Sequence, residues 1–434
     1  MIRSIFIVFF TFCMFPVMGQ GKKDQVLIYG ESEACWAAAI QSSKSGVKTL
    51  WIADPRHIGT RFTGEGNVHI TANKGLDAGL WADILQKVSR EKALSDSVLN
   101  AAKRSLNPRL VQNSFSAFID STNNLTVRKD VQVKRIKKAG EQWRVYLSNN
   151  ETIKVAAIVD GSDGADLAKL LDKDDLSDSY VDTVGHVPQE IYENTLYRSG
   201  LVVTEKKDRP SLIPAFAFLN TPASNFFIIS RYGWLNKNLQ NGPQDIGFFI
   251  QSGQALGAIA AYCAFFKTTT DKINIRMLQG ELLANHGKLM PFQDIAIEDI
   301  HWAEIQRIGA TGLLQGNYVQ QGASVQFHFN PEKPVSSDEI KPIMLQLYTR
   351  SQLWFKDKQI ENLTLKDLAS LIKFTALKGD EIDAEMEKGW NKYFNFSGDY
   401  DPECYLTRRH VAVLIDYYLK PFNVKIDRNG IFRY

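Results

Sequence analysis

The residues best suited to carry chemistry lie near the N-terminus, where a glycine and an acid each follow a short apolar run. Gly30 comes after residues 25–29 (QVLIY), and Asp54, 24 positions beyond it, comes after residues 47–52 (VKTLWI). Such runs indicate buried parallel strands, and the alanine-rich residues 33–44 between them indicate a helix. In a strand–glycine–helix–strand unit the glycine permits a tight turn. The helix N-terminus offers backbone amides to a diphosphate, and the acid accepts hydrogen bonds from ribose hydroxyls. The spacing therefore predicts a dinucleotide site, and the alternative is an ordinary α/β unit with a glycine turn.

The phosphate loop of this unit departs from the usual G-x-G-x-x-G pattern. Its first glycine is present, but Ser32 and Cys35 stand at the second and third glycine positions. We expect the Cys35 thiol to obstruct a close contact between helix and strand that normally contains no side chain. Glu31 and Glu33 place two carboxylates beside a diphosphate, which is repulsive unless their side chains point away. These departures predict that a dinucleotide is bound weakly or that its binding has been lost.

The remaining pattern up to residue 291 is that of an α/β fold, with apolar strands alternating with helices. Residues 77–103, 253–266 and 278–286 are predicted helices, and residues 125–133, 142–147 and 155–159 are predicted strands. The strands at 125–133 and 142–147 alternate polar with apolar residues, which favours an antiparallel pair.

Composition and charge exclude several classes of protein. The chain has 434 residues, of which 44% are hydrophobic and 23% charged, as is typical of globular domains. A net charge of +3 gives no reason to propose nucleic acid as a partner. The four cysteines form no CxxC pair and the seven histidines show no ligand spacing, so the sequence predicts no metal site and no disulfide scaffold.

The first nineteen residues are expected to be a signal peptide rather than part of the fold. Arg3 precedes a nearly uncharged apolar run over residues 4–18, which ends at the small residue Gly19. The alternative is a membrane anchor, but the run is shorter than the roughly 20 apolar residues of a spanning helix. We therefore expect an exported protein, in the periplasm or at the cell surface, with no transmembrane helix in the mature chain.

Three stretches between residues 25 and 300 resemble the FAD-dependent oxidoreductase family of secreted bacterial proteins, often misnamed xanthan lyases. Residues 26–59 are similar to the family's opening strand, phosphate loop and E-P-x-x-H-L-G-G segment. Asp160 and Gly164 lie in residues 156–171, which resemble the segment V-I-D-A-x-x-x-G-D-L. The third stretch, residues 250–266, looks like the last flavin motif, G-Q-A-A-G-T-A-A-A.

This resemblance implies a Rossmann-like FAD/NAD(P)-binding domain that holds FAD and transfers a hydride to flavin from an unknown substrate. It implies that Gly253 and Gly257 let the backbone approach the flavin ring, and that Val131 contacts adenine through its backbone. The cofactor-binding residues expected on this basis are Gly30, Ser32, Glu33, Ala34, Cys35, Asp54, Val131, Asp160, Gly164, Gly253, Gln254 and Gly257. The alternative for residues 253–266 is a buried helix whose small residues serve tight packing. No catalytic acid or base is identified.

The family usually inserts a long substrate domain before its last flavin motif, whereas only residues 167–252 are available here. The substrate region is therefore expected to be reduced. The alternative function is a non-catalytic binding or structural protein that keeps a degenerate flavoprotein fold, attached to a surface through its C-terminal repeats.

After Pro291 the pattern changes to repeated helix starts. Three stretches each combine an apolar residue, a Ser or Thr and a helical spacing of apolar residues: 335–345, 363–373 and 406–416. Ser336 and Thr364, each with an acid three residues later, resemble helix N-caps.

Residues 300–314 and 329–339 resemble S-layer homology repeats, and residues 406–410 resemble a second copy in which His410 replaces the acid. The resemblance implies that a cell-envelope polymer is a partner, and the alternative is a packing domain. The sequence thus predicts a signal peptide over residues 1–19, an FAD/NAD(P)-binding-like domain over 20–291 and a small all-α repeat domain over 292–434.

Overall fold

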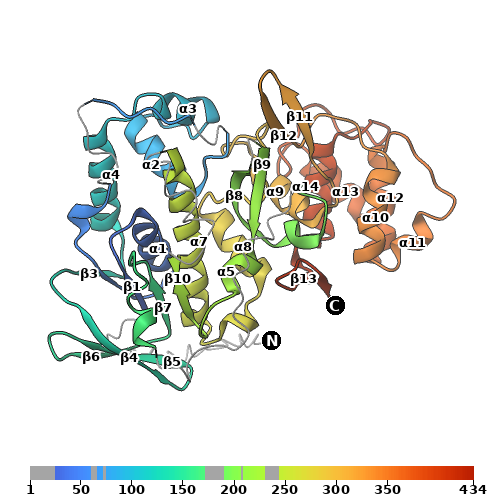
Figure 1. Cartoon of the computed structure of the whole chain (residues 1–434). Helices are drawn as coiled ribbons and strands as arrows, with labels where there is room; N and C mark the ends of the chain where they lie inside the picture. The colour runs from blue at the N-terminus through green and yellow to red at the C-terminus, as the bar shows by residue number, and fades with distance from the viewer. Residues whose placement is uncertain (1–24, 60–65, 72–74, 172–189, 207–208, 230–243) are drawn as a thin grey trace, which may run out of the picture.

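The computed structural model describes residues 25–59, 66–71, 75–171, 190–206, 209–229 and 244–434. Figure 1 shows an α/β region at the N-terminal side and a helical region at the C-terminal side. The predicted signal peptide lies outside the described residues.

The N-terminal region is built on a parallel sheet with the strand order β10-β7-β1-β2-β3. Its strands are β1 (Val26–Tyr29), β2 (Thr49–Ile52), β3 (Leu125–Arg128), β7 (Ala157–Asp160) and β10 (Phe226–Ile228). Every pair of neighbouring strands is parallel. Helix α1 (Glu33–Lys44) connects β1 to β2, over the residues that the sequence predicted. The predicted Rossmann-like α/β fold is confirmed.

Side chains that alternate along β1 enter two different layers. Val26 and Ile28 join the core beneath α1 and the long helix α7 (Ile246–Phe265), whereas Leu27 joins a second core against a three-stranded antiparallel sheet. That second sheet contains β4 (Val133–Ala139), β5 (Gln142–Leu147) and β6 (Thr152–Val155). The parallel sheet is therefore covered on both faces, as its continuous apolar strands require.

The prediction of one antiparallel strand over residues 125–133 is wrong. The segment divides into β3, which extends the parallel sheet beside β2, and the start of β4, which belongs to the antiparallel sheet. Asp130 at the junction has a φ of +63°, so the chain changes direction there. Alternation in a short segment did not distinguish a parallel edge strand from an antiparallel one.

The N-terminal region also contains other helices. They are α2 (Gly79–Ser89), α3 (Asp96–Lys103), α4 (Pro108–Ser121), α5 (Ala215–Leu219) and α8 (Ile275–Ala284). A hairpin of β8 (Gly200–Lys206) and β9 (Arg209–Pro214) lies between the two regions in Figure 1. Of the described helices, α7 alone has the length and apolar character of a membrane span, yet 89% of its most apolar window is buried in the protein.

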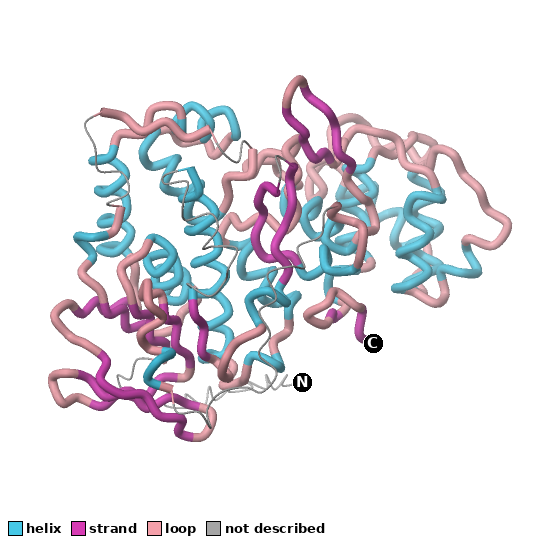
Figure 2. Tube along the Cα trace, viewed as in Figure 1, coloured by secondary structure: helices cyan, strands magenta, loops and turns pink. Residues whose placement is uncertain are grey.

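The C-terminal region is helical and also contains two short hairpins (Figure 2). Its helices are α9 (Trp302–Thr311), α10 (Ser337–Leu347), α11 (Ser351–Trp354), α12 (Leu365–Ala376), α13 (Glu381–Gly389) and α14 (Arg408–Tyr418). The hairpins are β11 (Asn317–Gln321) with β12 (Ser324–His328), and β13 (Lys425–Ile426) with β14 (Phe432–Arg433). One apolar core runs through both regions of the chain, so the division at residue 291 stays a prediction.

The three predicted helix starts meet one another through backbone hydrogen bonds. The amide of Leu363 donates to Val335 at 2.8 Å, and the amide of Leu406 donates to Leu363 at 2.8 Å. The amide of Arg408 donates to Lys333 at 2.9 Å and completes the connection. The segments that precede α10, α12 and α14 are thus held together by backbone hydrogen bonds, as expected of a repeated unit.

The predicted N-caps of these helices are also confirmed. The Ser336 hydroxyl accepts from the amide of Glu339, and Thr364 forms a capping box with Asp367. In α14 the corresponding position is His410, whose Nδ1 accepts from the amide of Thr407 at 3.2 Å. A neutral imidazole therefore accepts the hydrogen bond from the N-cap amide that a carboxylate accepts in a usual capping box.

Because protonation would remove this acceptor, we expect His410 to make the C-terminal region sensitive to acid. Burial lowers the pKa of His410 from its ordinary value; nearby Arg409 and His301 lower it further, and Glu332 opposes them. A pKa that is lower in the folded state stabilises the fold above the unfolded pKa of about 6.5, and this stabilisation is lost as the pH falls through the folded value. The denaturation midpoint should fall between pH 7 and pH 5, and it should fall less in His410→Gln, where the amide oxygen accepts at every pH. An equal fall in both proteins would contradict this, and exposed His69→Gln serves as the control.

Candidate functional site

A cavity of about 880 Å³ lies at the carboxyl ends of β1, β2, β3 and β7. This edge of an open parallel sheet is where α/β proteins bind ligands. The cavity is lined by Tyr29, Gly30, Glu31, Ser32, Glu33, Ile52, Ala53, Asp54, His57, Arg128, Lys129, Asp130, Val131, Gln132, Ser148, Gly161, Ser162, Asp163 and Asp166. Five of the predicted cofactor-binding residues are among them: Gly30, Ser32, Glu33, Asp54 and Val131.

The loop after β1 has the geometry of a phosphate loop. Gly30 has a φ of +124°, and a Cβ at this position would lie 2.6 Å from the backbone of Gly161. Only glycine fits here for two reasons. The backbone conformation is unfavourable for other residues, and the loop after β1 is in contact with the loop after β7. Ser32 then begins α1 as its N-cap, its hydroxyl accepting from the amide of Cys35, so that the N-terminus of α1 faces the cavity.

The prediction that Cys35 obstructs this loop is wrong. Its thiol is buried, and it occupies the space that a side chain at position 161 would fill: a Cβ on Gly161 would lie 2.0 Å from Cys35 Sγ. The glycine missing from α1 is thus replaced by a glycine on the neighbouring loop. Cys35 and Ala34 are buried in the core and do not line the cavity. Burial raises the pKa of Cys35 to about 11, so the thiol stays protonated at neutral pH.

The carboxylate of Glu31 is paired within the loop. Its Oε1 accepts from the amide of Asp54 at 3.0 Å, and its Oε2 pairs with His57 Nδ1. Glu31 therefore joins the phosphate loop to the segment after β2, and the hydrogen bond that His57 donates to Glu31 raises the pKa of His57. The repulsion that we expected from Glu31 is offset by this partner, while Glu33 is buried against the start of α1.

The Asp54 carboxylate lies at the end of β2, where the sequence predicted a ribose acceptor. The Arg56 side chain donates to it, at 2.9 Å from Nε to Oδ1, and this hydrogen bond holds the pKa of Asp54 well below its ordinary value. Asp54 is therefore an anion throughout the physiological range. Both of its oxygens accept from Arg56, so a ribose hydroxyl would share this carboxylate with the exposed Arg56 side chain. Val131 and Gln132 follow β3 on the far side of the cavity from the phosphate loop.

Two other predicted cofactor-binding residues, Asp160 and Gly164, lie at the end of β7 and in the loop that follows it, outside the cavity. Asp160 Oδ1 accepts from the amide and hydroxyl of Ser162, and Oδ2 accepts from the amide of Ala168 at 3.1 Å. Asp160 is fully buried and shapes the loop after β7, and burial raises its pKa. Neither residue lines the cavity.

The prediction that Gly253 and Gly257 approach a flavin ring is not supported by their position. Helix α7 begins at Ile246, so Gly253 lies about two turns inside it rather than at its N-terminus. A Cβ on Gly253 would lie 2.1 Å from the carbonyl oxygen of Ala34, and one on Gly257 would lie 2.4 Å from that of Ala38. These glycines let α7 pack backbone to backbone against α1, which was the alternative reading of residues 253–266.

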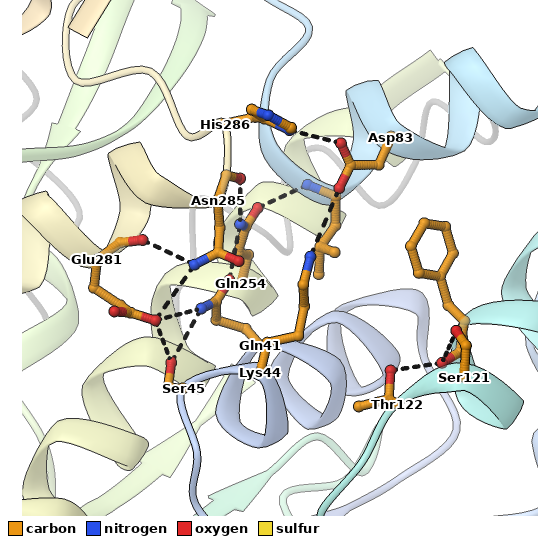
Figure 3. Close-up of polar contacts among 12 residues, drawn as sticks. Gln41, Lys44, Ser45, Asp83, Ser121, Thr122, Gln254, Glu281, Asn285 and His286 are labelled. Atoms are coloured by element: carbon orange, nitrogen blue, oxygen red, sulfur yellow. Dashed lines mark hydrogen bonds and ion pairs between the residues drawn. The ribbon is translucent and has the colours of Figure 1, made fainter. Parts of the chain in front are cut away.

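Gln254 likewise serves packing rather than the cavity. Figure 3 shows its side chain within a group of polar residues between α1, α2 and α8. Its Nε2 donates to Gln41 Oε1 at 2.9 Å and to the carbonyl of Asn285 at 3.1 Å, and its Oε1 accepts from the amide of Leu80 at 2.9 Å. With these bonds the amide has no polar atom free for a ligand.

Sequence reasoning missed several residues that line the cavity, including Arg128 and Gln132 at the end of β3, Ser148 after β5 and Gly161 after β7. The signal for Arg128 and Gln132 was the parallel position of β3, since the end of a strand beside β2 opens on the same edge of the sheet. Among the described residues, no group of three or more His, Cys, Asp or Glu side chains is arranged to hold a metal ion.

Two parts of the cavity wall suit the adenosine diphosphate half of a dinucleotide, although six carboxylates line the cavity against the two cations Arg128 and Lys129: Glu31, Glu33, Asp54, Asp130, Asp163 and Asp166. A helix N-terminus and a glycine backbone with φ of +124° lie at one end, and an ionised acid at the end of β2 faces the other. Beyond this half, the described residues do not define a place for the flavin ring.

Residues 25–172, about a third of the chain, match the family model described as FAD dependent oxidoreductase. No curated protein matches the chain. Solved structures with similarity include p-nitrophenol 4-monooxygenase PnpA from Pseudomonas putida DLL-E4, at 10% identity over 32% of this chain and 40% of that chain, with a TM-score of 0.21. Bacillithiol disulfide reductase Bdr from Staphylococcus aureus has 12% identity over 32% and 38%, with a TM-score of 0.21. Tetracycline destructase Tet(51) has 12% identity over 36% and 42%, with a TM-score of 0.23. The chain thus spans less than half the length of each of these structures.

Proposed function

We propose that the protein is an FAD-dependent oxidoreductase whose N-terminal region holds the adenosine diphosphate half of FAD in the cavity described above. One observation carries the proposal: every residue that lines this cavity lies within the segment that matches the FAD dependent oxidoreductase model.

The residues have separate roles in this proposal. The N-terminus of α1 and the backbone of Gly30 receive the diphosphate, Asp54 accepts from the ribose hydroxyls, and Val131 contacts the adenine. His57 offsets the charge of Glu31 beside the diphosphate. When bound, FAD supplies the acceptor for a hydride from a substrate that is not identified.

The direct test is the absorption spectrum of the purified full chain, followed by denaturation and identification of any nucleotide released. We expect a flavin band and the release of FAD, either as purified or after incubation with FAD. A chain that shows no flavin band after such incubation contradicts the proposal and indicates a fold that has lost its cofactor.

We also propose that the chain is exported, since Arg3, the apolar residues 4–18 and Gly19 form the pattern of a signal peptide. N-terminal sequencing of protein recovered from the cell envelope should begin at Gln20 or Gly21. An intact Met1 would contradict the proposal.

For the C-terminal region we propose contact with a cell-envelope polymer, as its resemblance to S-layer homology repeats suggests. A groove of about 460 Å³ between α9 and α14 supports this, because it combines the exposed rings of Tyr393 and Tyr417 with the paired charges of Arg307 and Asp416. The full chain should sediment with isolated envelopes, and the variant Tyr393→Ala/Tyr417→Ala should sediment less. Equal sedimentation of both proteins would contradict this assignment of the groove.

A further inference from the structure

The antiparallel sheet of β4, β5 and β6 has an unusual concentration of positive charge. Residues 133–155 contain six Lys and Arg against two Asp and Glu, a local excess of +4, whereas the whole chain carries +3. The rest of the chain is therefore slightly negative, and the sheet holds more than the entire excess of the protein.

Strand register aligns part of this charge on one face. Lys137 on β4 lies opposite Arg144 on β5, and Arg144 lies opposite Lys154 on β6. Their sequence neighbours Ile136, Trp143 and Val155 are fully buried on the other face of the sheet. Since side chains alternate along a strand, the three cations share the outer face, spaced by about 4.8 Å per strand.

This row of like charges destabilises the sheet, because like charges directly opposite each other repel. In the described part of the chain, no hydrogen bond, ion pair or ring contact engages the side chains of Lys137, Arg144 or Lys154, and the same holds for neighbouring Arg135. Lys138, on the inner face, contrasts with them: it donates to the carbonyl of Ser224 and lies over the Trp143 ring. Among the described residues, nothing therefore competes with an external anion for this outer row.

We propose that this outer face, defined by Arg135, Lys137, Arg144 and Lys154, binds an acidic polysaccharide. The partner is a linear polymer because the cations form a flat row rather than a closed pocket. Residues 125–155 include no exposed large apolar side chain, so the face offers no apolar anchor for a membrane. Its one aromatic residue, half-buried Tyr146 opposite Arg135, gives a single ring rather than the successive platforms on which single-stranded nucleic acids stack. Recognition by charge alone suits a polymer that carries carboxylate, sulfate or phosphate groups.

The face is separate from the cavity proposed for FAD, and the inference does not depend on that proposal. Figure 1 shows β4, β5 and β6 at the outer margin of the molecule, away from the C-terminal region. None of the four residues of this face lines the cavity, so a nucleotide and a polymer can be tested separately on the same chain.

The test is a titration of the full chain with polygalacturonate at low and high salt. We expect binding that weakens steeply with salt, and at least a 30-fold weaker affinity in Lys137→Gln/Arg144→Gln/Lys154→Gln. The matched control is Lys356→Gln/Lys378→Gln/Lys388→Gln, which removes three exposed lysines of the C-terminal region and should change the affinity less than threefold.

A measurement of stability distinguishes a loss of polymer binding from a loss of folding. The single variant Arg144→Glu would place a carboxylate between Lys137 and Lys154, so it should raise the denaturation midpoint while it weakens polymer binding. The proposal is overturned if the wild type does not bind polygalacturonate, or if both sets of variants bind alike. Tighter binding to phosphatidylglycerol vesicles or to a single-stranded oligonucleotide than to the polymer would also overturn it.

Discussion

Replacing Gly253 with alanine is expected to lower the free energy of unfolding by about 3 kcal/mol, the upper end of the usual effect of overpacking. The added Cβ would lie 2.1 Å from the carbonyl oxygen of Ala34, and that oxygen belongs to the backbone of a helix that is buried along nearly its whole length. Neither helix can yield without disturbing the core beneath the parallel sheet. Chemical denaturation of wild type and variant measures the effect.

The matched control is Gly280→Ala in α8. A Cβ there meets no atom within 4 Å, so the only expected effect is the gain in helix propensity, about 0.5–1 kcal/mol of added stability. The same substitution should therefore act in opposite directions in two helices. If Gly253→Ala is as stable as the wild type, the close packing of α7 on α1 is incorrect.

The second large effect is expected for Gly30→Ala, which should weaken FAD binding by a factor of one hundred or more. The residue has a φ of +124°, and the new Cβ would lie 2.6 Å from the carbonyl carbon of Gly161. To accommodate it, the loops after β1 and β7 must separate, which displaces the backbone that faces the diphosphate. Fluorescence titration with FAD measures the loss.

Gly46→Ala provides the control for backbone strain alone. Gly46 also has a positive φ, +80°, but nothing lies within 4 Å of its Cβ position and it does not line the cavity. Both variants should be somewhat less stable, and only Gly30→Ala should lose FAD. Equal affinity in the two variants would show that the phosphate loop lies elsewhere.

The local part of the fold could be predicted from the sequence. The bounds of α1, the strands on either side of it and the acid after β2 follow from apolar runs and from one glycine, which depend on neighbouring residues alone. The caps at Ser336 and Thr364 were predictable for the same reason, since each cap involves residues three positions apart.

Contacts between distant residues could not be predicted in this way. Cys35 appeared to obstruct the loop because its partner, Gly161, lies 126 positions later, in the loop after β7. The small residues at 253 and 257 suit a flat ring and a neighbouring helix equally well, and only the position of Ala34 and Ala38 decides between them. The apolar run of β3 indicates a strand, but it does not indicate which other strand β3 pairs with, and in the structure that strand is β2.

The most direct test of the proposed cofactor site is a titration of the full chain with FAD in the presence and absence of ADP. We predict one FAD per chain, displacement by ADP, and at least tenfold weaker binding of both nucleotides in Asp54→Asn, which loses a charged acceptor worth about 1.5–3 kcal/mol. FAD binding that ADP does not affect and that Asp54→Asn leaves unchanged would contradict the assignment of the cavity.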